Sequence, residues 1–234
     1  MRRVALSLAV PVAVLGLSGC IGPDGRKAEM LLQQAQQAQA AVTSERFVMR
    51  FDIDVQGHQV SMAMDGGAYL KGPHRGDFYA TMTGSGVPQL QNLTTTLVKR
   101  GAVAAIRANG QTQRVAVPTA EQQFGSPVQM LDLERYVTSV SVDSSVYDGR
   151  PADRIVGKLD TQALLGSAGL ASKVLEQSGA HFGDIRAVLY VPRDTHRVEV
   201  MFADLDIKAD GQTAHMHVSL ATRDVDKPLE IPQL

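Results

Sequence analysis

The feature that most constrains the fold of this 234-residue chain is an alternation of apolar and polar residues with a period of two. Its first segment covers residues 46–55, in which the apolar positions are Phe47, Met49, Phe51, Ile53 and Val55. The segment after Gly57-His58 repeats the pattern with Val60, Met62 and Met64. A period of two is that of a β-strand with one buried and one solvated face. The two segments therefore predict an antiparallel hairpin that turns at Gly57-His58.

Four pairs of Asp or Asn followed by Gly occur in the chain beyond residue 64. Such pairs suit the positive backbone φ angles of tight hairpin turns. The four pairs are Asp65-Gly66, Asn109-Gly110, Asp148-Gly149 and Asp210-Gly211. The segments around them alternate or are β-branched, and they predict strands over residues 77–83, 93–99, 102–107, 112–117, 137–147, 152–159, 185–191, 196–208 and 213–223.

Three stretches have a helical pattern. The first, residues 26–42, is rich in Ala and Gln, and its apolar positions at helical spacing are Leu31, Ala35, Ala38 and Val42. The second covers residues 127–136. The third, residues 160–177, begins with Asp160 as an N-cap and has glycines at 166 and 169 that weaken its middle. This third stretch is therefore one helix, two short helices or a mobile flap.

An antiparallel sheet with one apolar face must bury that face against other elements. The sequence therefore predicts an α+β fold, in which a single curved antiparallel sheet has amphipathic helices covering its concave face. No composition shift or proline-rich linker divides residues 26–234, which predicts one domain. A cavity remains if the helices cover the concave face incompletely.

The N-terminus predicts where the protein works. Arg2 and Arg3 precede an apolar run from Val4 to Leu15, and the order is typical of a secretory signal. The closing Leu17-Ser18-Gly19-Cys20 is similar to a bacterial lipobox, whose cysteine receives lipid after cleavage. We expect residues 1–19 to be a signal peptide, Cys20 to carry the membrane anchor, and residues 20–25 to tether the domain to the extracytoplasmic face. The alternative is an ordinary cleaved signal with a chance cysteine at its end.

Composition and motifs argue against several classes of function. The formal net charge is −1 and the basic residues are scattered, so the electrostatic footprint of a nucleic-acid-binding protein is missing. Cys20 is the only cysteine, which excludes an intramolecular disulfide and leaves no second thiol for catalysis. The chain has neither a nucleophile elbow nor a phosphate-binding glycine loop. We therefore expect a protein that is not an enzyme and holds no cofactor.

Three motifs carry a family resemblance: residues 147–151 (YDGRP), 155–160 (IVGKLD) and 226–232 (DKPLEIP). With the lipobox, the first helix and the long final hairpin in matching order, the chain resembles the mycobacterial LppX/LprG-type lipoproteins. The resemblance implies a LolA-like fold, a half-open barrel with a helical lid around a lipid cavity. It also implies an acylated lipid as the ligand, and an envelope transporter or a lipoprotein as a protein partner. The chain departs from the family in having no Trp and few rings in its middle strands.

The apolar stripes are the candidate lining of such a cavity. The residues expected on the concave face are Phe47, Met49, Phe51, Ile53, Met62, Met64, Leu205 and Met216. Their pattern alone is equally consistent with plain packing against the helices, and the resemblance favours a cavity. Long acyl chains would gain affinity from burial alone, at about 0.8 kcal/mol per methylene group. The alternative function is that of an envelope sensor or adaptor that uses the same fold to bind a protein.

Polar residues converge only in the final hairpin. A two-residue turn at Asp210-Gly211 would place Asp206 opposite His215 and Asp204 opposite His217. Two imidazoles and two carboxylates could hold a divalent metal ion. The other face of the hairpin is apolar, so we favour exposed charge pairs and expect no metal. Val198, Val200 and Phe202 alternate in the opposite phase to Leu205 and Ile207, which predicts a β-bulge near Ala203.

Overall fold

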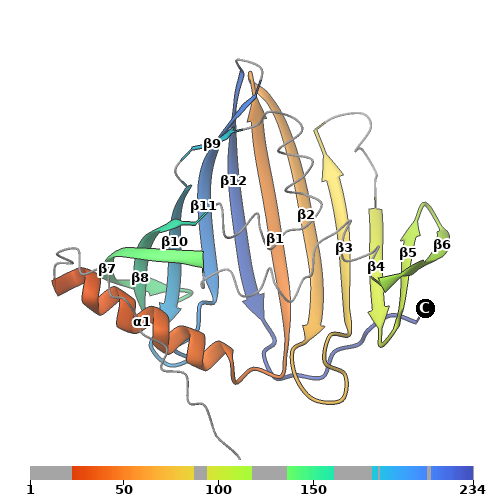
Figure 1. Ribbon diagram of the computed structural model, residues 1–234, viewed down its shortest axis with the longest axis horizontal. Coiled ribbons are helices and arrows are strands. Elements are labelled where there is room, and N and C mark those ends of the chain that lie inside the picture. The colour runs from red at the N-terminus through yellow and green to blue at the C-terminus, as the bar shows by residue number, and fades with distance from the viewer. Residues whose placement is uncertain are drawn as a thin grey trace, which may run out of the picture.

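A computed structural model describes residues 23–86, 94–117, 136–160, 181–183, 185–209 and 212–233. Within these residues, one helix, α1 (Pro23–Gln39), lies on a twelve-stranded antiparallel sheet (Figure 1). The strands are β1 (Ser44–Val55), β2 (His58–Tyr69), β3 (Phe78–Ser85), β4 (Thr94–Arg100), β5 (Val103–Ala108), β6 (Gln111–Ala116), β7 (Val137–Tyr147), β8 (Arg150–Leu159), β9 (His181–Phe182), β10 (Ile185–Pro192), β11 (Val200–Ala209) and β12 (Gln212–Arg223).

The sheet is a single open layer whose strands follow the order β6-β5-β4-β3-β2-β1-β12-β11-β10-β8-β7. β9 lies off this path and pairs with β11. The described edges β6 and β7 are not paired with each other, so the sheet does not close into a barrel. The α+β fold with one antiparallel sheet and a helix on its apolar face is therefore confirmed. Among the described residues, no helix has both the length and the hydrophobicity to cross a bilayer.

Most strands lie where the alternation predicts them. β7 has the predicted bounds, and the other predicted strands differ from the observed ones at their ends. The two-residue β9 was not predicted. The predicted helices over residues 127–136 and 160–177 fall outside the described residues, except for Tyr136 and Asp160 at their ends.

Two of the four predicted tight turns are confirmed by their backbone angles. Asn109-Gly110 and Asp148-Gly149 have φ values of 50° and 76°, and of 50° and 72°. The first hairpin turns one residue earlier than predicted, at Gln56-Gly57, where both φ angles are also positive. Asp210-Gly211 lies outside the described residues, and its flanking residues Ala209 and Gln212 are paired.

The predicted turn at Asp65-Gly66 is wrong, because both residues lie inside β2. Asp65 is paired with Val48 and Gly66 with Phe47, so the ladder between β1 and β2 runs through this position. The glycine serves packing instead of turning. A Cβ atom at Gly66 would lie 2.4 Å from the carbonyl oxygen of Tyr79 and 2.6 Å from Cζ of Phe47. The Phe47 ring therefore lies directly over the Gly66 backbone.

Gly66→Ala is accordingly expected to lower the free energy of unfolding by about 1–3 kcal/mol, because the new methyl group meets backbone that cannot move aside. Urea denaturation measures the change. Gly183→Ala is the matched control, since its Cβ would meet nothing nearer than 3.8 Å, and it should change stability by less than about 0.5 kcal/mol. Equal effects of the two substitutions would contradict this packing role.

Helix α1 contributes one side to the core. It begins at Pro23 instead of the expected Arg26, because a proline suits the first helical turn, whose N–H groups have no partner within the helix. Its buried side chains are Ala28, Leu32 and Ala35, and the helix packs against β7. Ala35 is therefore buried as the predicted stripe requires, whereas Leu32 takes the place expected for Leu31. Leu31 is only half-buried, and Val42 is buried beyond the end of the helix.

The predicted β-bulge near Ala203 is also wrong, since β11 pairs without interruption with β10 and β12. The change of phase arises because aromatic side chains cover the outer face of this strand. Phe202 makes an edge contact with Tyr190 and stacks on His217, with ring centroids 6.2 and 5.9 Å apart. Tyr190 in turn lies 5.3 Å from Tyr147. Apolar side chains therefore face both sides of β11 here without a break in register.

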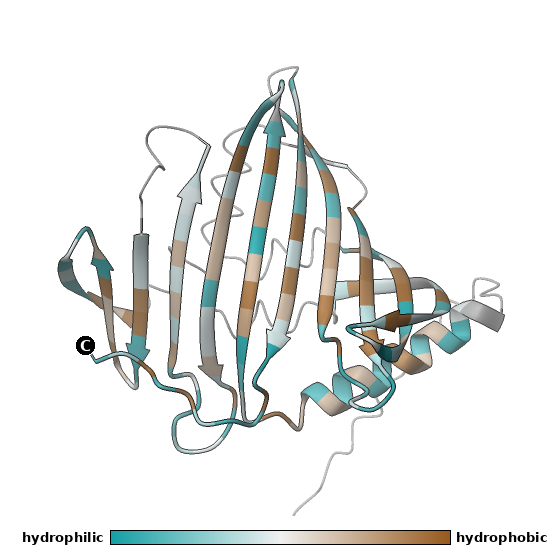
Figure 2. Cartoon of the chain, turned by 180° about the vertical axis from the view of Figure 1, so that it is seen from behind, coloured by the Kyte–Doolittle hydropathy of each residue, from teal (hydrophilic) through white to brown (hydrophobic). Residues whose placement is uncertain are grey.

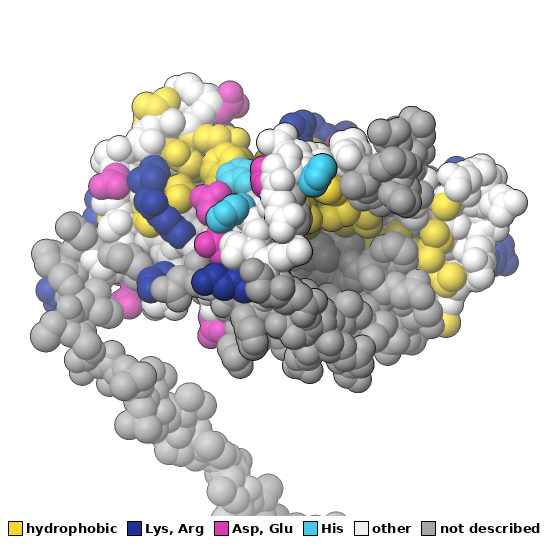
Figure 3. Space-filling model, turned by 90° about the horizontal axis from the view of Figure 1, so that it is seen from above, with side chains coloured by type: hydrophobic (Ala, Val, Ile, Leu, Met, Phe, Trp, Pro, Cys, Tyr) yellow, Lys and Arg dark blue, Asp and Glu magenta, His cyan; other side chains and the backbone are white. Residues whose placement is uncertain are grey.

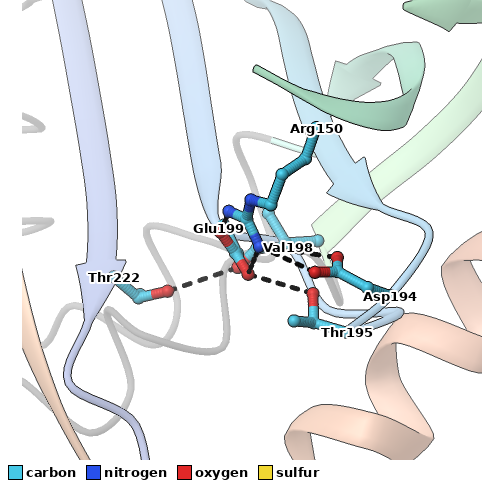
Figure 4. Close-up of polar contacts among 6 residues, drawn as sticks. All are labelled: Arg150, Asp194, Thr195, Val198, Glu199 and Thr222. Atoms are coloured by element: carbon cyan, nitrogen blue, oxygen red, sulfur yellow. Dashed lines mark hydrogen bonds and ion pairs between the residues drawn. The ribbon is translucent and has the colours of Figure 1, made fainter. Parts of the chain in front are cut away.

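Polar contacts hold the β10–β11 connection to the start of β8 (Figure 4). Arg150 donates hydrogen bonds to Glu199 and to Asp194, the latter at 3.3 Å. Thr195 Oγ1 donates to Glu199 Oε1 at 3.0 Å. Arg150 belongs to the YDGRP motif, so this motif provides both the turn after β7 and the hydrogen bonds that hold the β10–β11 connection.

The C-terminal segment runs along the lower edge of the sheet in the view of Figure 1. Asp226 accepts hydrogen bonds from the N–H and hydroxyl of Thr43 at 2.7 and 2.8 Å. Further along, the Tyr69 hydroxyl accepts from the N–H of Leu229 at 3.0 Å, and Arg100 donates to the carbonyl of Ile231. The DKPLEIP motif therefore ties the lower ends of β1, β2 and β4 together.

Candidate functional site

The alternation gives the sheet an inner face, defined by Phe47, Met49 and Leu220, and an opposite outer face. The inner-face residues belong to one hydrophobic core with Ala28, Leu32 and Ala35 of α1. Bands of hydrophobic and hydrophilic residues alternate along the central strands in Figure 2. The register joins these bands across four strands, so that Ile53 is flanked by Val60 of β2 and Met216 of β12, and Met216 is flanked by Leu205 of β11.

All eight residues predicted to line a cavity lie on this inner face, and burial divides them into two groups. Phe47, Met49 and Met64 are 1%, 2% and 8% exposed and belong to the core. The other five are half-buried: Phe51, Ile53, Met62, Leu205 and Met216. The half-buried group lies farther from α1, toward the turn between β1 and β2. Plain packing describes the first group, and the lining role of the second stays a prediction.

An open pocket of about 650 Å³ lies at this end of the four strands. Its lining consists of one apolar row and two polar rows. The apolar row is Ile53, Val60, Leu205 and Met216. The polar rows are Asp54, Gln59, His215 and Asp206, and Asp52, Ser61, His217 and Asp204. Side chains of successive rows point to opposite faces of the sheet, so the hydrogen-bonding side chains of the two polar rows lie on the outer face, opposite the apolar row.

The predicted histidine–aspartate pairs are confirmed on the outer face. His215 Nδ1 lies 2.6 Å from Asp206 Oδ1, and His217 Nδ1 lies 2.6 Å from Asp204 Oδ1. In the strand register each histidine also stands opposite an aspartate of β1 that was not predicted from sequence, Asp54 opposite His215 and Asp52 opposite His217. Seen from above in Figure 3, histidine and acidic side chains gather beside hydrophobic ones.

These pairs are separate, exposed two-residue contacts. Within the described part of the chain, no three or more His, Cys, Asp or Glu side chains come together to hold a metal ion. The preference for charge pairs over a metal site stays a prediction. In the same region, Ser61 Oγ donates to Asp52 Oδ1 at 2.5 Å and the N–H of Gly57 donates to Asp54 Oδ1 at 2.9 Å, so hydrogen bonds orient both carboxylates of β1.

A carboxyl group at the lower end of β1 is buried, which was not predicted from sequence. Glu45 is 0% exposed, although it stands among charged and polar residues in the sequence. A signal was present, because Glu45 lies two residues before Phe47 and so in phase with the inward positions. Burial raises the pKa of Glu45 to about 7, while the hydrogen bond from Gln39 and the charge of Arg197 lower it and the charge of Asp226 raises it.

Comparison with solved structures shows which proteins share this architecture. LprF from Mycobacterium bovis superposes with a TM-score of 0.61 at 14% sequence identity, over 91% of this chain and 99% of that chain. The lipoprotein LppX from Mycobacterium tuberculosis superposes with a TM-score of 0.53 at 13% identity, over 88% and 99% of the two chains. No protein-family model and no curated protein matches the sequence. The predicted resemblance to LppX/LprG-type lipoproteins is therefore confirmed for the fold.

Proposed function

We propose that this protein is an extracytoplasmic lipoprotein, anchored to the membrane through Cys20, that binds acyl chains of a lipid or lipoprotein on the inner face of its sheet and carries them within the cell envelope. The observation that carries the proposal is the group of half-buried apolar side chains Phe51, Ile53, Met62, Leu205 and Met216. A folded soluble domain ordinarily buries such side chains or scatters them, whereas these five lie on neighbouring strands of one face.

The chemistry of this group suits acyl chains. Two of the five are methionines, whose flexible side chains adapt to ligands of irregular shape. Each methylene group of a chain that leaves water for such a surface contributes about 0.8 kcal/mol, so a long chain binds without polar recognition. The fold shared with LprF and LppX is consistent with the proposal.

Met62→Arg tests the proposal at the inner face. The guanidinium would occupy the half-buried apolar surface, and we expect at least a tenfold loss of affinity for a fluorescent fatty-acyl probe, because an acyl chain cannot solvate the charge. Met62 is preferable to Met64, since Met64 is buried and an arginine there would unfold the sheet. Circular dichroism and thermal melting establish that the variant is folded before binding is measured.

Thr83→Arg is the matched control, because it places the same charge on an exposed residue of neighbouring β3. Its affinity for the probe should equal that of the wild type. Lipid extracted from wild-type protein purified from its own host, and identified by mass spectrometry, would name the ligand. The proposal fails if the wild type carries no lipid and takes up no probe, and that result would favour the alternative role of an envelope sensor or adaptor.

A further inference from the structure

We propose that Glu45 is a proton-operated latch on helix α1, which holds the end of the helix against the sheet while its carboxyl group is neutral and releases it on ionisation. The side chain lies at the place where α1 meets β1. Gln39, the last residue of α1, donates a hydrogen bond from Nε2 to Oε1 of Glu45 at 2.8 Å. This contact joins the helix end directly to a buried position of the central strand.

The second oxygen of the carboxyl group bears on its protonation state. Oε2 of Glu45 is buried and receives no hydrogen bond from any described residue. A carboxylate in this position would leave one charged oxygen without a donor, which is costly in a protein interior. A neutral carboxyl group loses much less on burial, so the observed packing suits the protonated form.

Two charged groups face Glu45 from the other elements packed around it. Arg197, in the connection between β10 and β11, favours the ionised form, and the carboxylate of Asp226, in the C-terminal segment, opposes it. Hydrogen bonds from the N–H and hydroxyl of Thr43 hold the pKa of Asp226 below its usual range, so this neighbour is negatively charged. Gln39 of α1 is uncharged, and its hydrogen bond favours the ionised form, but burial has the larger effect and keeps the pKa of Glu45 raised. Arg197 forms no ion pair with Glu45 in this arrangement, and its buried Nη1 has no hydrogen-bond partner among the described residues.

The consequence is a pH-dependent docking of α1. The pKa of Glu45 is about 7 in the docked arrangement and returns toward its ordinary value of 4.5 when the helix end moves away and water reaches the carboxyl group. Docking therefore takes up a proton. It is most stable below about pH 4.5, weakens as the pH rises, and reaches its weakest level above about pH 7. Because α1 packs on the inner face, the latch would also regulate access to the lipid, a step that rests on the proposed function.

Hydrogen exchange of the full chain measures this latch. The quantity to compare is the opening equilibrium of peptides from residues 28–39, obtained by correcting each exchange rate for its intrinsic dependence on pH. In the wild type we expect opening to increase by up to about tenfold per pH unit between pH 5 and 7, and to level off above that range. Peptides from β1 and β12 should not follow this change, because the latch acts locally.

Glu45→Gln should abolish the pH dependence, since the amide is similar in shape and does not ionise. Glu29→Gln is the matched control on the exposed face of the same helix, and it should keep the wild-type behaviour. Arg197→Gln should shift the midpoint to higher pH, because it removes the cation that favours the ionised form. Opening of wild-type α1 that does not vary with pH, or that varies equally in Glu45→Gln, would overturn the proposal.

Carbon-13 titration of the Glu45 carboxyl group in the wild type provides a direct measurement even if Glu45→Gln does not fold. A midpoint near pH 7 supports the latch, and a midpoint near pH 4.5 overturns it. Release of a bound acyl probe with rising pH is a separate measurement. If the protein binds no probe, the proposed function fails, while exchange and titration still decide whether Glu45 controls the docking of α1.

Discussion

Replacement of Phe47 by alanine is expected to lower the free energy of unfolding by about 3–5 kcal/mol, the range found for buried phenylalanines. Phe47 is 1% exposed, lies in a central strand between β2 and β12, and covers the backbone of Gly66 with its ring. Strands hydrogen-bonded on both sides cannot readily collapse into the space that the ring leaves. Denaturation in urea gives the change, and an unaltered m-value would show that the variant unfolds as the wild type does.

Phe51→Ala is the control for this prediction, because the same side chain is removed two positions away on the same face of β1. Phe51 is half-buried, so we expect a smaller loss of stability, about 1–2 kcal/mol, together with a weaker affinity for acyl probes. Phe47→Ala should instead lose stability more than affinity. Equal losses of stability in the two variants would contradict the division of the inner face into a core group and a half-buried group.

Cys20→Ala is expected to move the protein from the membrane fraction to the aqueous phase, the largest change in distribution that a single substitution in this chain should cause. The prediction is based on the run of apolar residues that ends with Leu17-Ser18-Gly19-Cys20. Several acyl chains on one cysteine hold a protein firmly, and their loss leaves no other anchor that the sequence predicts. Detergent phase separation of the protein expressed in its host measures the distribution, and mass spectrometry of the mature N-terminus measures the acyl mass.

Ser18→Ala is the matched control for the anchor, since it replaces one small residue by another and keeps the cysteine. It should stay in the detergent phase and carry the same acyl mass as the wild type. The anchor proposal is wrong if Cys20→Ala stays with the membrane and the wild-type N-terminus carries no acyl group.

The local pattern was sufficient to predict most of the strands and the main features of the final hairpin. A period of two specifies a strand with one buried face whatever lies beyond it, which is why β1, β7 and the first half of β2 were found from sequence. The facing positions of Asp206 and His215 follow from a two-residue turn and from the constant spacing of a ladder. Tight turns at Asn109-Gly110 and Asp148-Gly149 depend only on backbone φ at adjacent residues.

The tertiary structure decided the features that depend on what packs against a residue. Gly66 lies within a strand, where the Phe47 ring packs against its backbone and leaves no space for a side chain. The sequence rules for tight turns do not take such a packing contact into account. Phe202 breaks the expected phase because Tyr190 and His217 cover it from neighbouring strands. The same alternation also produced core residues near α1 and half-buried residues farther along the strands, and it carried Glu45 into the interior. The sequence by itself thus determined which residues share a face of the sheet. Burial along that face was decided by elements distant in the chain, because solvent exposure is a property of the assembled surface.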